Sequence, residues 1–196
     1  MTPEIRAFEF ALGLFAVLIG LAVADVATSF HRLMRNRTKV KWDPLALVAA
    51  LYSLLLAVGM WFDLWGVRHF EEVRHFVFYL AIVAQLFVLF LIAAASLPDD
   101  VESSIDLREF YAGNRRYFWF LVSLNQLAYL VLGVYFTSPI FSRLSPLQMV
   151  QAAITLGASF IVSLVLLAAK SRGAHYVGLA LLFLITLFHY WSMKIN

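Results

Sequence analysis

The chain has 196 residues, of which 63% are hydrophobic and 14% are charged, and its formal net charge is +3. A soluble domain usually has about 25% charged residues, and a chain of this size cannot bury so much apolar surface in one aqueous core. The absence of cysteine excludes disulfides, thiolate catalysis and cysteine-ligated metals. The basic residues form no aromatic-interleaved surface of the kind that binds nucleic acid. We therefore expect an integral membrane protein whose partner is the lipid bilayer.

Six apolar segments are long enough for transmembrane helices, because a bilayer core about 30 Å thick needs about 20 apolar residues. They are residues 8–30, 44–65, 76–97, 117–136, 146–169 and 174–191. Pro44 and Pro146 each follow a residue that can cap a helix, which suits the first helical position. Pro98 predicts the end of the third helix, and Gly66 and Gly173 can close helices in the left-handed conformation. The expected fold is all-α, with a single domain of six transmembrane helices.

Most of the 15 Lys and Arg residues fall in the first, third and fifth loops. These are Arg32, Arg35, Arg37, Lys39, Lys41, Arg108, Arg115, Arg116, Lys170 and Arg172. Because short basic loops stay in the cytoplasm, we expect both termini on the outer side of a membrane, in bacterial terms the inner membrane. Ala22-Val23-Ala24 also fits a signal-peptide cleavage site, but Glu4 and Glu9 precede it where a signal peptide needs positive charge.

Residues 98–116 form a sizeable loop on the predicted cytoplasmic side. Ser103 or Ser104 can cap a short helix there, and Gly113 can end it. Leu107 and Phe110 would share one face of this helix, which could then lie in the membrane interface. The alternative is a connector whose charges are solvated, and the shortness of the helix favours that interpretation.

An aspartate, Asp25, lies near the end of the first apolar segment. Ser29 and Arg32 follow it at spacings of four and three residues, so the three side chains share one helix face. Asp25 can be an anchor that pairs with Arg32 near the inner surface, where arginine side chains extend to the interface. The functional alternative is an ion or proton site, the default hypothesis for a carboxylate inside a membrane.

The other side of the first segment has small residues at helical spacing. They are Gly13, Ala16, Gly20, Ala24 and Ala27. Small residues let two helix backbones approach closely in lipid. The stripe therefore predicts a tightly packed helix–helix contact along this segment.

Further polar residues are predicted within the membrane. Gln85 lies near the middle of the third segment, and Asn125 and Gln126 near the middle of the fourth. The fifth segment has polar residues every four positions: Gln151, Thr155, Ser159 and Ser163. Such groups either join helices by hydrogen bonds or line a polar pathway. Glu9 and Asp63, near the outer ends of their helices, could flank an outer vestibule.

The histidines are the one argument for a cofactor. His31 and His175 are expected at the inner surface, and His75 and His189 at the outer surface. Paired histidines across a bundle could ligate a haem, and His75 with the acidic residues just before it could hold a metal ion. Surface histidines are more usual, and neighbouring arginines compete for those carboxylates. We therefore expect no cofactor.

The sequence has no glycine-rich phosphate loop, zinc-protease motif or serine-hydrolase motif, so nothing indicates an enzyme. Three classes of function remain. The preferred one is a small channel or secondary transporter for an ion or small solute, because of Asp25 and the polar residues within the membrane. Six short helices seldom enclose a pathway alone, so we expect a homo-oligomer. The alternatives are a structural, assembly or sensory membrane protein, and a histidine-based haem or metal redox protein.

Overall fold

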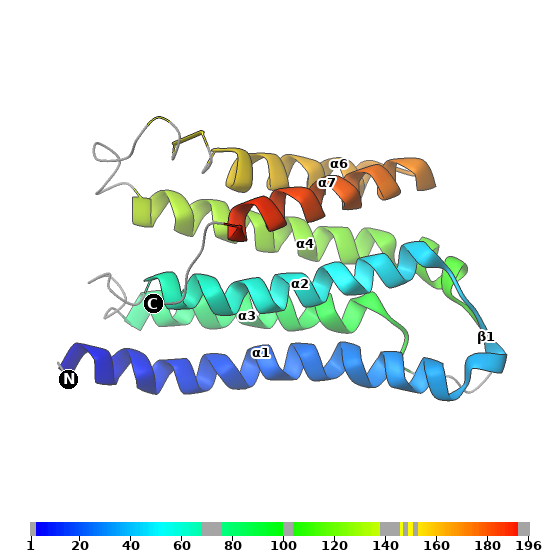
Figure 1. Cartoon of the computed structure of the whole chain (residues 1–196), viewed down its shortest axis with the longest axis horizontal. Helices are drawn as coiled ribbons and strands as arrows, with labels where there is room; N and C mark the ends of the chain where they lie inside the picture. The colour runs from blue at the N-terminus through cyan, green and yellow to red at the C-terminus, as the bar shows by residue number, and fades with distance from the viewer. Residues whose placement is uncertain are drawn as a thin grey trace. The chain divides into compact units, whose positions relative to one another are not determined.

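The computed structural model describes residues 3–67, 76–99, 104–137, 146, 149–150 and 153–191. The long helices are α1 (Pro3–Arg35), α2 (Pro44–Val67), α3 (Phe76–Ser96), α4 (Leu107–Thr137), α6 (Ser159–Ala168) and α7 (Arg172–Tyr190) (Figure 1). Short elements connect them: the 3-10 helix η1 (Arg37–Lys39), the π-helical segment η4 (Ala153–Ala158), and the strands β1 (Val40–Lys41) and β2 (Ile105–Asp106). The predicted all-α fold is confirmed.

Five helices of the described chain, α1 to α4 and α7, are long and apolar enough to cross a membrane. Their bounds follow the punctuation in the sequence, because α2 begins at Pro44 and α3 ends at Ser96, two residues before Pro98. The fifth predicted segment, 146–169, contains η4 and the shorter helix α6, and some of its residues lie outside the described ones. The structure is therefore that of a membrane-type helical protein.

The glycines do not end helices as the sequence suggested. Gly113 lies inside α4, which begins at Leu107 and continues to Thr137, so the separate short helix expected within 98–116 is part of a long one. Gly66 lies inside α2 and Gly173 inside α7, and no described glycine has a positive φ. Glycine permits the left-handed conformation but does not require it, and the helices continue through these positions.

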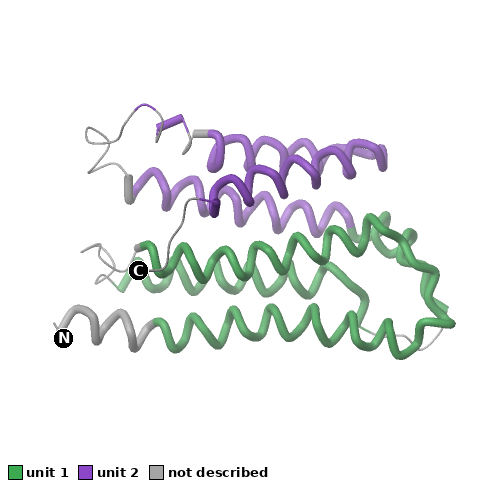
Figure 2. The backbone as a smooth tube through the Cα atoms, viewed as in Figure 1, with its two compact units in different colours: residues 1–114 green, residues 115–196 purple. Residues whose placement is uncertain are grey.

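The chain forms two compact units, residues 1–114 and residues 115–196 (Figure 2). In the first unit, α1, α2 and α3 run side by side and each packs against the other two (Figure 1). The face of α1 that lies in this bundle has buried apolar residues at spacings of three, four and seven: Phe15, Ile19, Ala22, Val26 and Leu33. Asn114, in the first part of α4, donates from Nδ2 to the Ala95 carbonyl at 2.5 Å. This bond joins the start of α4 to the end of α3.

The second unit consists of the rest of α4 with η4, α6 and α7. Two glycines allow close packing there. A Cβ atom on Gly178 of α7 would lie 2.5 Å from a Leu166 methyl of α6, and one on Gly133 of α4 would lie 2.7 Å from a Leu156 methyl of η4. The side chains of these leucines therefore occupy the space that a larger residue would need. This is the packing by small residues that membrane helices use.

The small stripe predicted on α1 behaves differently. Gly13, Gly20, Ala24 and Ala27 are exposed, and a Cβ on either glycine would meet nothing within 4 Å. Within the described chain this stripe makes no close helix–helix contact, and its packing against another helix stays a prediction. The face that packs is the neighbouring one, where larger apolar residues such as Phe15 and Val26 supply more buried area.

Candidate functional site

The candidate site lies in the first unit, where α1 meets the residues that follow α3. Asp25, Ser29 and Arg32 share one face of α1, as their spacing predicted. Pro98 comes just after α3 and ends it, and Asp99 follows at once. The structure therefore brings together three residues of α1 and one residue 67 positions beyond Arg32.

Two side chains of α1 hold Asp99 in place. The buried hydroxyl of Ser29 donates to Asp99 Oδ1 at 3.1 Å. Arg32 Nη1 donates to the Asp99 backbone carbonyl at 2.7 Å. Hydrogen bonds that involve a charged group are stronger than neutral ones, so these two bonds fix the position of Asp99 beside α1.

Asp25 itself has no direct partner among the described residues. Its Oδ2 atom is buried and accepts no hydrogen bond there. Asp99 and Arg32 both act on Asp25 electrostatically, Asp99 as a like charge and Arg32 as an opposite one. Asp25 thus has one like charge and one opposite charge near it.

This arrangement suits a small cation or a proton. Carboxylate and hydroxyl oxygens are hard ligands, which bind hard cations such as alkali and alkaline-earth ions. A cation bound at Asp25 would also offset the repulsion that the like charge of Asp99 exerts on it. Ser29 would keep Asp99 oriented while Asp25 Oδ2 stays available. We call Asp25, Ser29, Arg32 and Asp99 the α1 carboxylate group.

The sequence predicted Asp25 and Ser29 as site residues but missed Asp99. Arg32, the anchor partner that the sequence suggested for Asp25, acts on it electrostatically and also bonds to the Asp99 carbonyl. Asp99 falls within the loop that the sequence predicted as a connector with solvated charges. One available signal was Pro98, which ends α3 and places the next carboxylate at a helix end.

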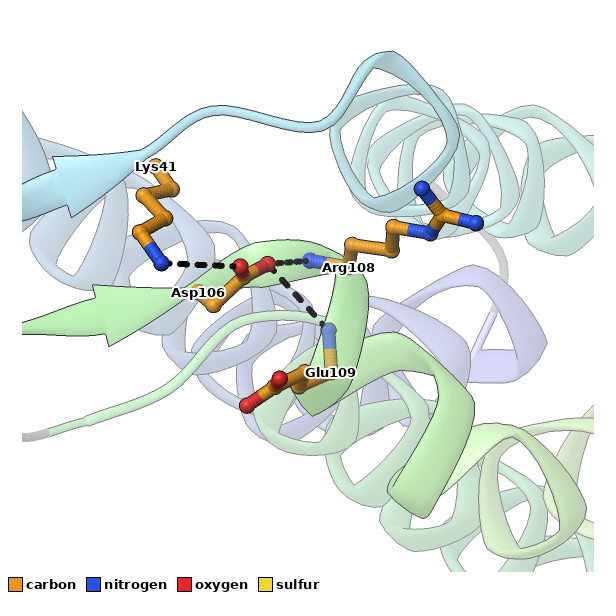
Figure 3. A network of polar contacts seen from close by, with 4 residues as sticks. All are labelled: Lys41, Asp106, Arg108 and Glu109. Atoms are coloured by element: carbon orange, nitrogen blue, oxygen red, sulfur yellow. Dashed lines mark hydrogen bonds and ion pairs between the residues drawn. The ribbon is translucent and has the colours of Figure 1, made fainter.

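A second polar cluster fixes the segments near this group. β1 and β2 form a two-residue parallel ladder that pairs Val40 with Ile105 and Lys41 with Asp106. Lys41 Nζ lies 3.7 Å from Asp106 Oδ2 (Figure 3). Asp106 Oδ1 accepts the backbone N–H groups of Arg108 at 2.9 Å and Glu109 at 3.4 Å, so Asp106 caps α4. The expected cap at Ser103 or Ser104 is replaced by Asp106.

The other predicted polar residue of the first unit is Gln85. It lies in the middle of α3 and is buried, and its Nε2 atom has no hydrogen-bond partner among the described residues. Asp63 is partly buried near the end of α2 and takes part in an interaction. The Glu9 side chain lies outside the described residues. The outer vestibule of Glu9 and Asp63 therefore stays a prediction.

The predicted polar residues of the second unit are all buried where the structure describes them. They are Asn125 and Gln126 in α4, Thr155 in η4, and Ser159 and Ser163 in α6. Ser163 donates to the Phe160 carbonyl of the same segment at 2.7 Å. The amide of Asn125 is 1% exposed, and neither of its polar atoms has a hydrogen-bond partner among the described residues. Gln151 lies outside the described residues.

His175 has structural contacts in the second unit. Its Nε2 atom lies 3.2 Å from the Ala169 carbonyl, and its ring packs on Trp119 with centroids 5.9 Å apart. Arg115 donates to the same carbonyl, and Ser171 caps α7 by accepting the Ala174 N–H at 3.1 Å. These contacts join α4, the end of α6 and the start of α7. These contacts within the protein account for the burial of His175, and no bound metal or haem is needed to explain it.

Among the residues that the structure describes, the remaining histidines belong to no metal-binding cluster. His31 is exposed at the end of α1, His189 packs edge-on against Tyr190 at 4.7 Å, and His75 lies outside the described residues. Over the part of the chain that the structure describes, no three histidine or acidic side chains lie close enough to hold a metal ion.

Comparisons with protein families, curated proteins and solved structures found no match to this chain.

Proposed function

We propose that the protein is a small channel or secondary transporter for protons or a small cation, and that the α1 carboxylate group is part of its pathway. The observation that carries this proposal is the buried Oδ2 of Asp25, which has no partner in the described chain although Asp99 lies within its electrostatic reach. A carboxylate inside a membrane is costly unless it is paired or used. The bonds from Ser29 and Arg32 go to Asp99, which leaves Asp25 able to bind an ion.

The membrane arrangement is part of this proposal. The segment made of η4 and α6 would be the fifth of six spans, and the basic loops would face the cytoplasm of a bacterial cell. Both termini would then lie outside, with the α1 carboxylate group near the cytoplasmic end of its helix. We also propose a homo-oligomer, because the exposed small stripe on α1 leaves a face on which a second helix could pack.

The test is ion flux in proteoliposomes loaded with a pH-sensitive dye, under imposed proton, sodium and potassium gradients. Asp25→Asn should lower the flux at least about tenfold, equivalent to losing about 1.4 kcal/mol of ion binding. Glu109→Gln is the matched control, because it also neutralises a carboxylate but lies on the exposed side of α4. Helical content and elution volume of the purified variants must match the wild type.

Equal flux in Asp25→Asn and Glu109→Gln would exclude Asp25 from the pathway. The absence of flux in the wild type would favour the second candidate function, a structural or assembly protein without transport. A specific observation favours this function: Ser29 and Arg32 both donate hydrogen bonds to Asp99, and these bonds join α1 to the residues that follow α3. If the protein is structural, the wild type conducts none of the tested ions, and Asp99→Ala lowers the thermal stability.

A further inference from the structure

Three cations lie at the end of α1 and just after it, in a segment with no acidic residue. Between Asp25 and Asp43 the sequence has no aspartate or glutamate, but it has five arginine and lysine residues: Arg32, Arg35, Arg37, Lys39 and Lys41. Two of the five are used within the protein, because Arg32 bonds to the Asp99 carbonyl and Lys41 pairs with Asp106. The other three are exposed and have no ion pair with any described residue.

The backbone that carries these three cations is held in place. α1 ends at Arg35, and Asn36 bonds back to the Arg32 carbonyl through its backbone N–H at 3.1 Å and its side-chain amide at 3.0 Å. Lys39 N donates to the Asn36 carbonyl at 2.8 Å, which closes η1. The next residue, Val40, is buried and belongs to the ladder with β2. The cations are therefore displayed by an ordered turn, so binding would need little further ordering.

An aromatic pair places this turn at the membrane surface. Trp42 packs edge-on against Phe30 with centroids 6.5 Å apart, and both rings are partly exposed. Tryptophan at the end of a membrane helix marks the level of the lipid headgroups. The apolar span of α1 ends at Arg35. Arg35, Arg37 and Lys39 therefore lie at the depth where lipid phosphates lie.

We propose that Arg35, Arg37 and Lys39 bind the phosphates of anionic phospholipids in the leaflet around the protein. A basic cluster directly beside a membrane helix attracts anionic headgroups, with a gain of about fivefold for each cation near the surface. Basic residues in a loop would by themselves indicate only which side of the membrane the loop faces. Three further features favour lipid binding here: the ordered turn, the absence of ion pairs with described residues, and the aromatic pair of Trp42 and Phe30.

The experiment measures quenching of Trp42 fluorescence by brominated lipids in reconstituted bilayers. The Trp42 signal is the difference between the wild type and Trp42→Phe, since the chain has 5 tryptophans. Brominated phosphatidylglycerol, at a fixed mole fraction, should quench this signal several-fold more efficiently than brominated phosphatidylcholine. Raising the salt concentration to 1 M, where the Debye length is about 3 Å, should remove most of the difference.

The triple variant Arg35→Gln/Arg37→Gln/Lys39→Gln should lose the preference for the anionic lipid. The matched control is Arg108→Gln/Arg116→Gln/Lys170→Gln, which removes the same charge from three other exposed positions and should keep the preference. Equal quenching by both lipids in the wild type would overturn the proposal, and that measurement needs no variant. A preference that survives in the Arg35/Arg37/Lys39 variant would also overturn it.

Inorganic phosphate separates lipid headgroups from a soluble anion. At equal ionic strength, phosphate and chloride should weaken the lipid preference to the same extent, because the protein binds headgroups that are concentrated in the bilayer. If millimolar phosphate abolishes the preference while chloride does not, the turn binds a soluble phosphate compound and the lipid proposal is wrong.

Discussion

The two compact units use their long-range polar contacts differently. In residues 1–114, Ser29 donates to the Asp99 carboxylate, and Arg32 donates to the backbone carbonyl of the same residue. In residues 115–196, Arg115 and His175 converge on the backbone carbonyl of Ala169. A backbone carbonyl is a fixed dipole, and its partners serve to satisfy it at a helix end.

A carboxylate, in contrast, can exchange one cation or proton for another. The first unit therefore contains carboxylates that could take part in ion movement, and Arg115, His175 and Ser171 of the second unit have contacts at helix ends. The comparison predicts that substitutions in the second unit act mainly on stability. Those in the α1 carboxylate group should act on flux.

The largest stability effect is expected for a glycine of the second unit. Gly178→Val should lower the free energy of unfolding by about 1–3 kcal/mol, because its Cβ would meet Leu166 atoms at 2.5, 2.7 and 2.8 Å. Gly20→Val on α1 is the matched control, and it should change stability much less because a Cβ there meets nothing within 4 Å. Unfolding in mixed micelles, followed by circular dichroism, measures both. Equal losses would mean that the small stripe on α1 is covered by another helix.

The adjacent amides of α4 provide the next test. Asn125→Leu should keep the stability within about 1 kcal/mol, because its buried polar atoms make no hydrogen bond within the described chain and a leucine of similar size removes two unsatisfied groups. Gln126→Leu should cost about 0.6–2 kcal/mol, since Gln126 has an interaction partner. The same unfolding assay compares them. A larger loss of stability in Asn125→Leu would show that the Asn125 amide holds helices together by hydrogen bonds.

The sequence predicts the helices well because the signal is local. Apolar length marks each span, and Pro44 and Pro98 mark two boundaries within two residues. The glycines were misleading because they too are a local signal. Gly113 has the conformational freedom to end a helix, but it stays helical inside α4. The start of α4 depends instead on Asp106, whose side chain accepts two backbone N–H groups and pairs with Lys41 from a distant loop.

The site was only half predictable from the sequence. Periodicity places Asp25 and Ser29 on one helix face, since that depends on a single helix. The partner of Ser29 is Asp99, 70 positions later, and this contact exists only because α1 packs along α3. Helix periodicity also places Arg32 where it acts electrostatically on Asp25, but a single helix could not reveal the bond from Arg32 to Asp99. A carboxylate just after a helix-ending proline, beside the basic end of another helix, is the pattern to look for.

The smallest expected effect separates two buried serines. Ser29→Ala removes a hydroxyl that donates to a carboxylate on another segment, so it should lower the free energy of unfolding by about 0.6–1.7 kcal/mol. Ser163→Ala removes a hydroxyl that donates to the Phe160 carbonyl near it in the same helical segment, and the change should be close to zero. A double-mutant cycle with Asp99→Ala isolates the interaction energy between Ser29 and Asp99, because the effect of Ser29→Ala should vanish when the Asp99 carboxylate is absent. If Ser29→Ala costs the same with and without Asp99, the hydroxyl stabilises α1 by another route, and the α1 carboxylate group is not held together through Ser29.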